Sequence, residues 1–200
     1  VFVGDGKGGD ALAPFWKRLR HSKAKIEAVA MDMGRAYIHA VTEHLPDAEI
    51  VFDHFHVVKL FNEKLSQLRR NLQREAEAEQ KHVLKGTRWL LLKNPVNLNE
   101  KKGEAEQLDE ALRLNAPLAT AYYMKEDLRR IWKQANWESG KFLLNDWIKR
   151  ARASGVGMLE KFAETLSDHW DGILNYYKFG RISTGPLEGM NNKIGAVQRA

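Results

Sequence analysis

Two aspartates directly follow short, mostly apolar runs in the first part of the chain. Asp32 comes after the run 26–31 and Asp53 after the run 49–52, and both runs have the length and composition of β-strands. Ligands bind at the carboxyl ends of parallel strands, so both carboxylates are candidates for a site there. For Asp32 two interpretations stay open: a carboxylate that faces a crevice, or the N-cap of a helix at 35–45.

Two histidines follow Asp53, in the order Asp53-His54-Phe55-His56. If the strand continued, His54 and His56 would share a face, whereas a helix that begins near His54 brings Asp53 and His56 together. A His-x-His pair is able to bind zinc, although no third ligand is evident nearby. The alternatives are a small-molecule zinc hydrolase, a structural pair of histidines, and a polar contact in a phosphate-processing site.

The stretch 183–194 reads STGPLEGMNNKI and contains a third candidate carboxylate, Glu188. One interpretation is structural: Gly185 caps a helix, Pro186 is its first residue, and Glu188 complements the positive helix end. The other is functional: Glu188 binds a metal ion, and polar side chains on the same helix bind phosphates. Those side chains are Asn191, Asn192, Lys193 and, further along, Arg199.

The composition is that of a folded chain with a moderate positive charge. Among its 200 residues, 32 lysines and arginines exceed 26 aspartates and glutamates, which gives a net charge of +6. This excess permits a polyanionic partner such as nucleic acid without requiring one. The absence of cysteine excludes disulfides, thiolate metal sites and a cysteine nucleophile. No apolar run reaches the roughly 18 residues that a membrane-spanning helix needs.

The expected elements divide the chain into two kinds of structure. Up to residue 57, strands alternate with helices, which is typical of a parallel sheet with crossover connections. From 57 to about 179 only helical patterns occur, and the tryptophans there are expected mainly to pack. The glycine-rich turn 4–9 fits a dinucleotide fingerprint or a plain turn. The expected strands are 1–3, 26–31 and 49–52, and the helices include 11–21, 36–45, 100–115, 117–134, 138–153, 156–177 and one from Pro186.

Three stretches together resemble one known family: VAMDMGRAY (29–37), IVFDHFHVVKLFNEKLSQLRR (50–70) and STGPLEGMNNKI (183–194). They are similar to DDE transposases of bacterial insertion sequences, in the ISL-three group, and RWLLLKNP (88–95) resembles that family's insertion. The resemblance covers essentially the whole chain. It implies an α/β, ribonuclease-H-like domain that is truncated at its start and interrupted by a large all-helical insertion, so that helices dominate. The implied parts are a partial core (1–57), the insertion (58–180) and a catalytic helix that returns to the core (181–200).

The family's active site contains three acids, and the resemblance implies roles for two residues of this chain. Asp32 matches the second acid and Glu188 matches the third. The first acid is expected on a strand upstream of Val1, so a fragment with two of the three acids is expected to be inactive by itself. The acids are implied to bind two Mg²⁺ (or Mn²⁺) ions that support DNA cleavage and strand transfer.

The resemblance also implies how the chain meets DNA. Asp53-x-x-His56 is similar to an element of related transposases whose histidine lies beside the active site and touches DNA, with Asp53 and His54 in supporting positions. Gly195 stands where relatives usually have another lysine, which weakens the basic stripe of the last helix. The expected DNA contacts are His56, Asn191, Asn192, Lys193 and Arg199. The implied partners are insertion-sequence ends, target DNA and a second copy of the chain in a homodimer, in the bacterial cytoplasm at the nucleoid and not at a membrane.

A second hypothesis retains DNA binding but not catalysis. A non-catalytic DNA-binding or dimerisation module derived from a transposase predicts salt-sensitive DNA binding with no need for metal. The zinc hydrolase predicts stoichiometric zinc in the purified protein. The transposase hypothesis predicts instead that cleavage depends on Asp32 and Glu188.

Overall fold

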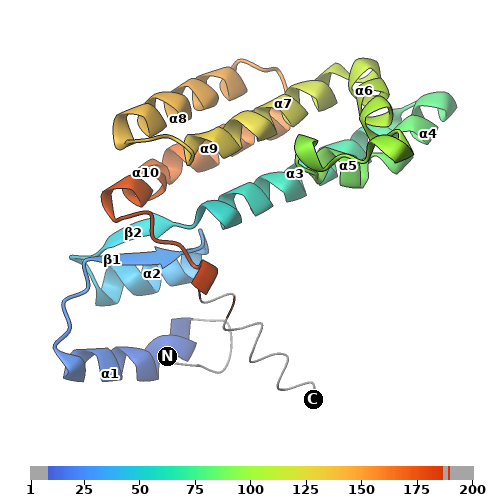
Figure 1. Ribbon diagram of the computed structural model, residues 1–200. Coiled ribbons are helices and arrows are strands. Elements are labelled where there is room, and N and C mark those ends of the chain that lie inside the picture. Colours follow the sequence, from blue (N-terminus) through green and yellow to red (C-terminus); the bar gives the residue numbers. More distant parts are fainter. Residues whose placement is uncertain (1–8, 187–188, 190–200) are drawn as a thin grey trace. The chain divides into compact units, whose positions relative to one another are not determined.

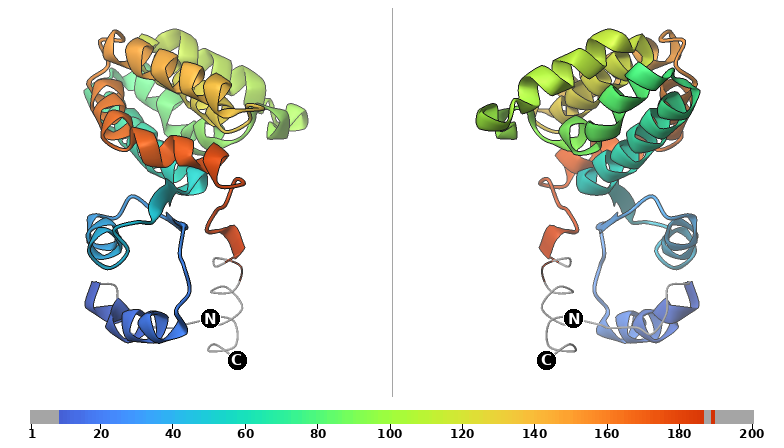
Figure 2. Two further views of the ribbon diagram at one scale, coloured as in Figure 1. Left: turned by 90° about the vertical axis from the view of Figure 1, so that its left-hand side faces the viewer. Right: turned by 90° about the vertical axis from the view of Figure 1, so that its right-hand side faces the viewer.

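The computed structural model describes residues 9–186 and Gly189, which form two compact units. The sheet unit contains the described residues up to Val57 and from His169 onward, and the helical unit is Val58–Asp168. Helices dominate both units, and the described residues contain one small parallel sheet (Figures 1 and 2). This agrees with the helix-dominated α/β class expected from the sequence. The predicted strand at 1–3 and most of the glycine-rich turn lie outside the described residues.

The sheet unit follows the predicted alternation of strands and helices. Its two strands pair in parallel, with Ala28 opposite Glu49 and Met31 opposite Phe52. A helix connects these adjacent parallel strands, which confirms the strand–helix–strand part of the prediction. The elements are η1 (Gly9–Leu12), α1 (Ala13–Ser22), β1 (Ala28–Met31), α2 (Arg35–His44), β2 (Glu49–Phe52) and α10 (Trp170–Lys178), and α3 (His54–Glu75) begins in this unit.

Helix α10 packs on β2 through close backbone approach and polar contacts. A Cβ atom at Gly172 would come within 2.4 Å of the Phe52 ring, so only glycine allows this approach. Asn175 Nδ2 donates to the Ile50 carbonyl at 3.0 Å and to Glu49 Oε2 at 3.0 Å. Lys178 Nζ lies 2.7 Å from Glu49 Oε1, and hydrogen bonds from Lys178 and Asn175 lower the pKa of Glu49.

One predicted helix is divided in the structure. The pattern over 156–177 predicts a single helix, but α9 (Gly157–Asp168) ends before His169 and α10 begins at Trp170. The His169 ring lies 4.9 Å from the Phe52 ring, so the break places an aromatic contact beside β2. Periodicity did not reveal the break because apolar residues continue at helical spacing on both sides of it.

The helical unit has an aromatic centre that joins three helices. The Phe61 ring of α3 lies 5.9 Å from Trp147 of α8 (Trp137–Arg152) and 5.0 Å from Phe162 of α9, all in edge-to-face geometry. Trp147 is completely buried, as expected for a packing tryptophan, whereas Trp89 is 63% exposed and does not follow that expectation. The remaining helices are α4 (Ala78–Gly86), α5 (Arg88–Leu92), η2 (Pro95–Asn97), η3 (Glu100–Lys102), α6 (Glu104–Leu114) and α7 (Ala116–Ile131).

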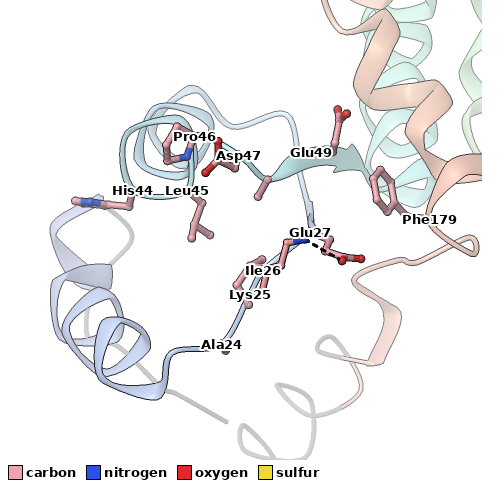
Figure 3. Close-up of a pocket in the computed structure, with 11 residues that line it drawn as sticks. Ala24, Lys25, Ile26, Glu27, His44, Leu45, Pro46, Asp47, Glu49 and Phe179 are labelled. Atoms are coloured by element: carbon pink, nitrogen blue, oxygen red, sulfur yellow. Dashed lines mark ion pairs between the residues drawn. The ribbon is translucent and has the colours of Figure 1, made fainter.

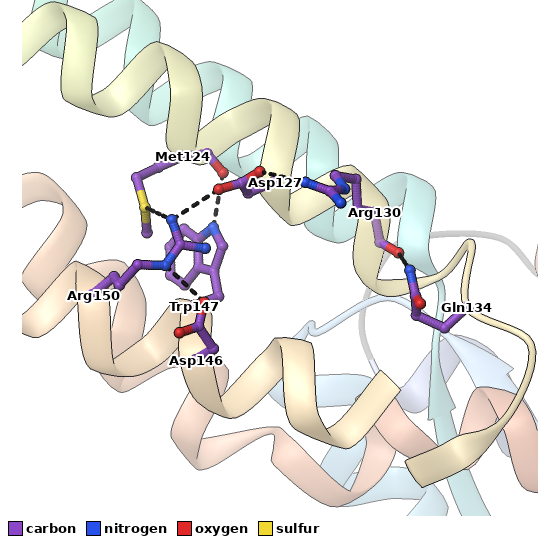
Figure 4. A network of polar contacts seen from close by, with 7 residues as sticks. All are labelled: Met124, Asp127, Arg130, Gln134, Asp146, Trp147 and Arg150. Carbon is purple, nitrogen blue, oxygen red and sulfur yellow. Dashed lines mark hydrogen bonds and ion pairs between the residues drawn. The ribbon is translucent and has the colours of Figure 1, made fainter. Parts of the chain in front are cut away.

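A polar network fixes α7 against α8 (Figure 4). Trp147 Nε1 donates to the Met124 carbonyl at 2.8 Å, so the buried indole has a partner. Arg150 joins the two helices because it contacts Asp127 at 2.8 Å and Asp146 at 2.7 Å. These acids outweigh the effect of burial and raise the pKa of the Arg150 guanidinium, which therefore stays charged.

A buried lysine donates hydrogen bonds to carbonyl groups at the carboxyl end of α5. Lys125 of α7 is fully buried, and its Nζ donates to the Leu91 carbonyl at 2.5 Å and to the Lys93 carbonyl at 3.3 Å. The last carbonyls of a helix lack intrahelical partners, and the lysine supplies them here. Burial lowers the pKa of Lys125, while Glu126, 2.7 Å from Nζ, opposes that effect. No helix in the described part of the chain is both long and apolar enough to cross a bilayer.

Candidate active site

The two aspartates lie side by side at the carboxyl end of the sheet. Asp32 follows Met31 of β1 and Asp53 follows Phe52 of β2, and these strand residues are paired in the parallel register. The Asp53 N–H donates to the Met31 carbonyl at 2.9 Å, which continues the strand pairing to the edge. The structure thus confirms that both acids stand where α/β sheets bind ligands.

Asp32 lies in a turn that leaves its carboxylate largely uncommitted. Its Oδ1 accepts a hydrogen bond from the Gly34 N–H at 2.8 Å. A Cβ atom at Gly34 would lie 2.7 Å from this oxygen, so the glycine makes room for the carboxylate. Gly34, and not Asp32, is the N-cap of α2, so the N-cap interpretation of Asp32 was wrong. Among the described residues, no cation pairs with Asp32, and its side chain is partly exposed.

Asp53 has the opposite environment, because protein donors occupy both of its carboxylate oxygens. It is 1% exposed, and its Oδ1 accepts the Phe55 N–H at 3.0 Å as the N-cap of α3. Its Oδ2 accepts the hydroxyl of Thr184 and the Thr184 N–H, the latter at 3.3 Å. His56 Nδ1 lies 3.3 Å from the same oxygen. The Asp53–His56 contact confirms the prediction made for a helix that begins near His54.

These donors decide the charge of Asp53. Burial tends to raise the pKa of this carboxyl, but the hydrogen bonds outweigh burial and its pKa lies below the usual value. The donors are Thr184, the Phe55 N–H and His56, with a further contribution from His54. Asp53 is therefore an ionised, fully bonded structural group, and Asp32 is the acid with oxygen lone pairs to offer.

Thr184 is the residue of this site that the sequence did not reveal. It lies 131 positions after Asp53 and is 9% exposed. Gly185 and Pro186 are already helical, so a helix begins directly after Thr184, and Gly185 is not the cap that one of the two interpretations of this stretch assumed. Threonine is a favoured N-cap residue and proline is favoured at the start of a helix, and these preferences were the local signals available. The contact fixes the start of the Glu188 segment at the end of β2.

The two histidines turn toward Asp53. His54 Nδ1 lies 3.6 Å from Asp53 Oδ1, and the His54 ring lies 5.5 Å from the ring of Tyr176 in α10. Burial lowers the pKa of His54, and the Asp53 charge opposes that effect. Within the described part of the chain, no three acidic or histidine side chains gather in a way that could hold a metal ion. His54 and His56 therefore have structural contacts, and the described residues give a zinc hydrolase no third ligand.

Five of the predicted site residues lie outside the described residues. These are Glu188, Asn191, Asn192, Lys193 and Arg199. The described residues bring together Asp32, Asp53, His54 and His56.

A shallow hollow elsewhere in the sheet unit does not belong to this site (Figure 3). It is lined by the residues that lead into the two strands, among them Glu27, Pro46, Asp47 and Glu49. The hollow therefore lies at the amino end of the sheet, whereas Asp32 and Asp53 follow the carboxyl ends.

The shifted pKa values predict how stability depends on pH. The pKa of His54 is lowered in the folded state, so its stabilising contribution is present above about 6.5 and declines as pH falls below that value. The pKa of Asp53 is also lowered, so its contribution is present above about 3.9 and is lost as pH falls through the folded pKa. Urea unfolding at pH 7, 5, 4 and 3 should show two successive losses. His54→Gln should remove the first, and Asp53→Asn should reduce the second.

Comparison with known proteins identifies the family. Residues 1–200 match the family model of the DDE transposases of the ISL3 group, described as Transposase, and the chain belongs to this family. It is 34% identical over 203 residues to the transposase of insertion sequence element IS1001 from Bordetella parapertussis, which covers 100% of the chain and 49% of that protein. It is 28% identical over 223 residues to the transposase of IS1557 from Mycobacterium tuberculosis, with 100% and 49% covered.

The chain therefore spans about half the length of these relatives. No solved structure gives a significant match.

Proposed function

We propose that the chain is part of the catalytic core of an insertion-sequence transposase that cleaves DNA and joins it to a target with the help of divalent metal ions. The observation that carries this proposal is the contrast between two neighbouring acids. Asp53 is buried and both of its carboxylate oxygens accept hydrogen bonds, whereas Asp32 is partly exposed beside it and, among the described residues, accepts a hydrogen bond from Gly34 alone. A carboxylate with free lone pairs at a strand end is suited to metal binding, and membership of the DDE transposase family supports that role.

The donor set fits Mg²⁺ or Mn²⁺. Asp32 offers oxygen, which hard divalent cations prefer, and Glu188 would supply a second carboxylate from the helix that starts after Thr184. When bound, the metal ions would supply an activated water or DNA 3′-hydroxyl and stabilisation of the leaving 3′-oxygen. Asp53 would contribute indirectly, because it accepts hydrogen bonds at the start of α3 and from Thr184, four residues before Glu188.

The remaining parts of the proposal concern the intact protein. We propose a ribonuclease-H-like core with a helical insertion, with the first acid of the triad outside these 200 residues. Activity of the chain by itself would then be absent. DNA ends and target DNA would meet His56, Asn191, Asn192, Lys193 and Arg199, in a homodimer that acts in the bacterial cytoplasm.

The test uses DNA that carries the insertion-sequence end, with sulfur in place of the 3′-bridging oxygen of the scissile phosphate. We expect the intact protein to cleave normal DNA with Mg²⁺ or Mn²⁺ and to stop when EDTA removes the metal. The sulfur substrate should be cleaved poorly with Mg²⁺ and well with Mn²⁺, because Mn²⁺ accepts sulfur more readily. Cleavage that persists in EDTA would overturn the proposal. Salt-sensitive binding without any cleavage would point to the non-catalytic module instead.

A further inference from the structure

One part of the helical unit carries a marked excess of positive charge. Residues 64–93 contain eight lysines and arginines and three glutamates, which gives this stretch a local net charge of +5. This stretch comprises the second part of α3 and the whole of α4 and α5. Localised positive charge of this kind is the usual electrostatic sign of a polyanion-binding surface.

Exposed arginines on α3 are held by neutral amides. Arg70 Nη2 donates to Gln67 Oε1 at 2.6 Å, and Arg74 Nη2 donates to Asn71 Oδ1 at 2.6 Å. Gln67 Nε2 in turn donates to Asn71 Oδ1 at 2.8 Å, which links the four side chains. Positions three and four apart lie on one side of a helix, so these residues form a row along α3. We call Gln67, Arg70, Asn71 and Arg74 the amide–arginine ladder.

The ladder differs from several other exposed arginines of the helical unit. Arg113 pairs with Asp109 at 2.7 Å, and Arg152 pairs with Glu164 at 2.9 Å. In the part of the chain that the structure describes, neither Arg70 nor Arg74 forms an ion pair with a carboxylate. Neutral partners orient a guanidinium without cancelling its charge, so the ladder presents two fixed and uncompensated cations to solvent.

A third cation lies near the ladder. Arg69 is 7% exposed, and its Nη1 donates to the Leu84 carbonyl at 3.0 Å, which ties α3 to the end of α4. Burial lowers the pKa of Arg69, and the neighbouring positive charges of Arg88 and Arg70 lower it further. The Arg88 guanidinium lies 4.7 Å from the centre of the exposed Trp89 ring, which steadies it. Repulsion between gathered cations is relieved when an anion binds.

We propose that the amide–arginine ladder, together with Arg88, binds the phosphate backbone of duplex DNA at a place separate from the catalytic carboxylates. Arginine is suited to this task because its planar, charged fork donates two hydrogen bonds to one phosphate. The ladder arginines form no ion pair with a carboxylate among the described residues, and contacts to phosphates would be independent of DNA sequence and sensitive to salt. This inference rests on the proposed function for the identity of the polyanion.

The test measures binding of the intact protein to a fluorescent duplex over a series of salt concentrations. The double variant Arg70→Gln, Arg74→Gln keeps good helix formers on α3. We expect its affinity to fall on the order of tenfold or more near 0.1 M salt, and the slope of log affinity against log salt to flatten by about 2. The matched control is Arg113→Gln, Arg130→Gln, which removes the same charge from arginines that already have acid partners.

A variant that adds a negative charge tests the effect of charge without the loss of an arginine side chain. Asn71→Asp is nearly isosteric and places a carboxylate against Arg74, so it should weaken DNA binding although every arginine remains. Unchanged DNA affinity and an unchanged salt slope in both ladder variants would overturn the inference. The same result is expected if this surface binds an acidic protein instead of DNA. Failure of the proposed function would appear differently, as cleavage without metal, while the ladder variants would still weaken binding.

Discussion

Replacing Asp32 by asparagine is expected to reduce DNA cleavage by about a thousandfold or more and to leave folding and DNA affinity almost unchanged. The amide keeps the size of the side chain and its acceptor for the Gly34 N–H, so the turn after β1 is preserved. It loses the negative charge that a divalent cation requires. Loss of about 4 kcal/mol of transition-state stabilisation from the metal corresponds to a thousandfold lower rate.

The measurement is cleavage by the intact protein at saturating DNA, with binding and urea unfolding recorded in parallel. Asp47→Asn is the matched control, because this exposed aspartate lies at the amino end of the same sheet. The control should cleave at the wild-type rate. If Asp32→Asn also cleaved normally, Asp32 would not bind a catalytic metal.

Replacing Asp53 by alanine is expected to have its main effect on stability. The change removes the N-cap of α3 and leaves the hydroxyl and N–H of Thr184 without their acceptor in a buried position. Loss of a buried, charged hydrogen-bond acceptor of this kind costs about 3 kcal/mol of unfolding free energy. Urea unfolding at pH 7 measures this loss, and Asp32→Asn serves as the neighbouring control that should not show it.

Two substitutions of Thr184, the residue that donates to Asp53, provide a sharper comparison. Thr184→Val keeps the shape of the side chain but removes the hydroxyl, whereas Thr184→Ser keeps the hydroxyl. We expect Thr184→Val to lower both stability and cleavage, and Thr184→Ser to retain most of both. Equal behaviour of the two variants would show that the hydroxyl of Thr184 does not anchor the segment that leads to Glu188.

Local patterns were sufficient to predict the strand ends and the contact between Asp53 and His56. Apolar runs marked β1 and β2, and a single helical turn relates Asp53 to His56, so neighbours in sequence determined these features. The family resemblance singled out Asp32, although it said nothing of Gly34, which makes room for the carboxylate.

The features that the sequence did not predict depend on residues that are far apart in the chain. Thr184 meets Asp53 across 131 positions, and no periodicity within a short window encodes that pairing. At the break, His169 contacts Phe52, which likewise lies far away in sequence. The sequence places Arg70 and Arg74 four positions apart, but a solvated helix face gives the same pattern. The amide partners, and the lack of acids near them, became clear only from the side-chain contacts.

The hydrogen bond from Asn175 to the Ile50 carbonyl determines the direction in which the sheet is able to grow. In a parallel strand alternate residues face opposite edges, and the N–H groups of Glu49 and Asp53 face β1, so Ile50 faces the outer edge of β2. Asn175 occupies that carbonyl, and α10 therefore blocks the addition of a strand on this side. Any further strand must join next to β1, so the sheet is able to widen only from the side that carries Asp32.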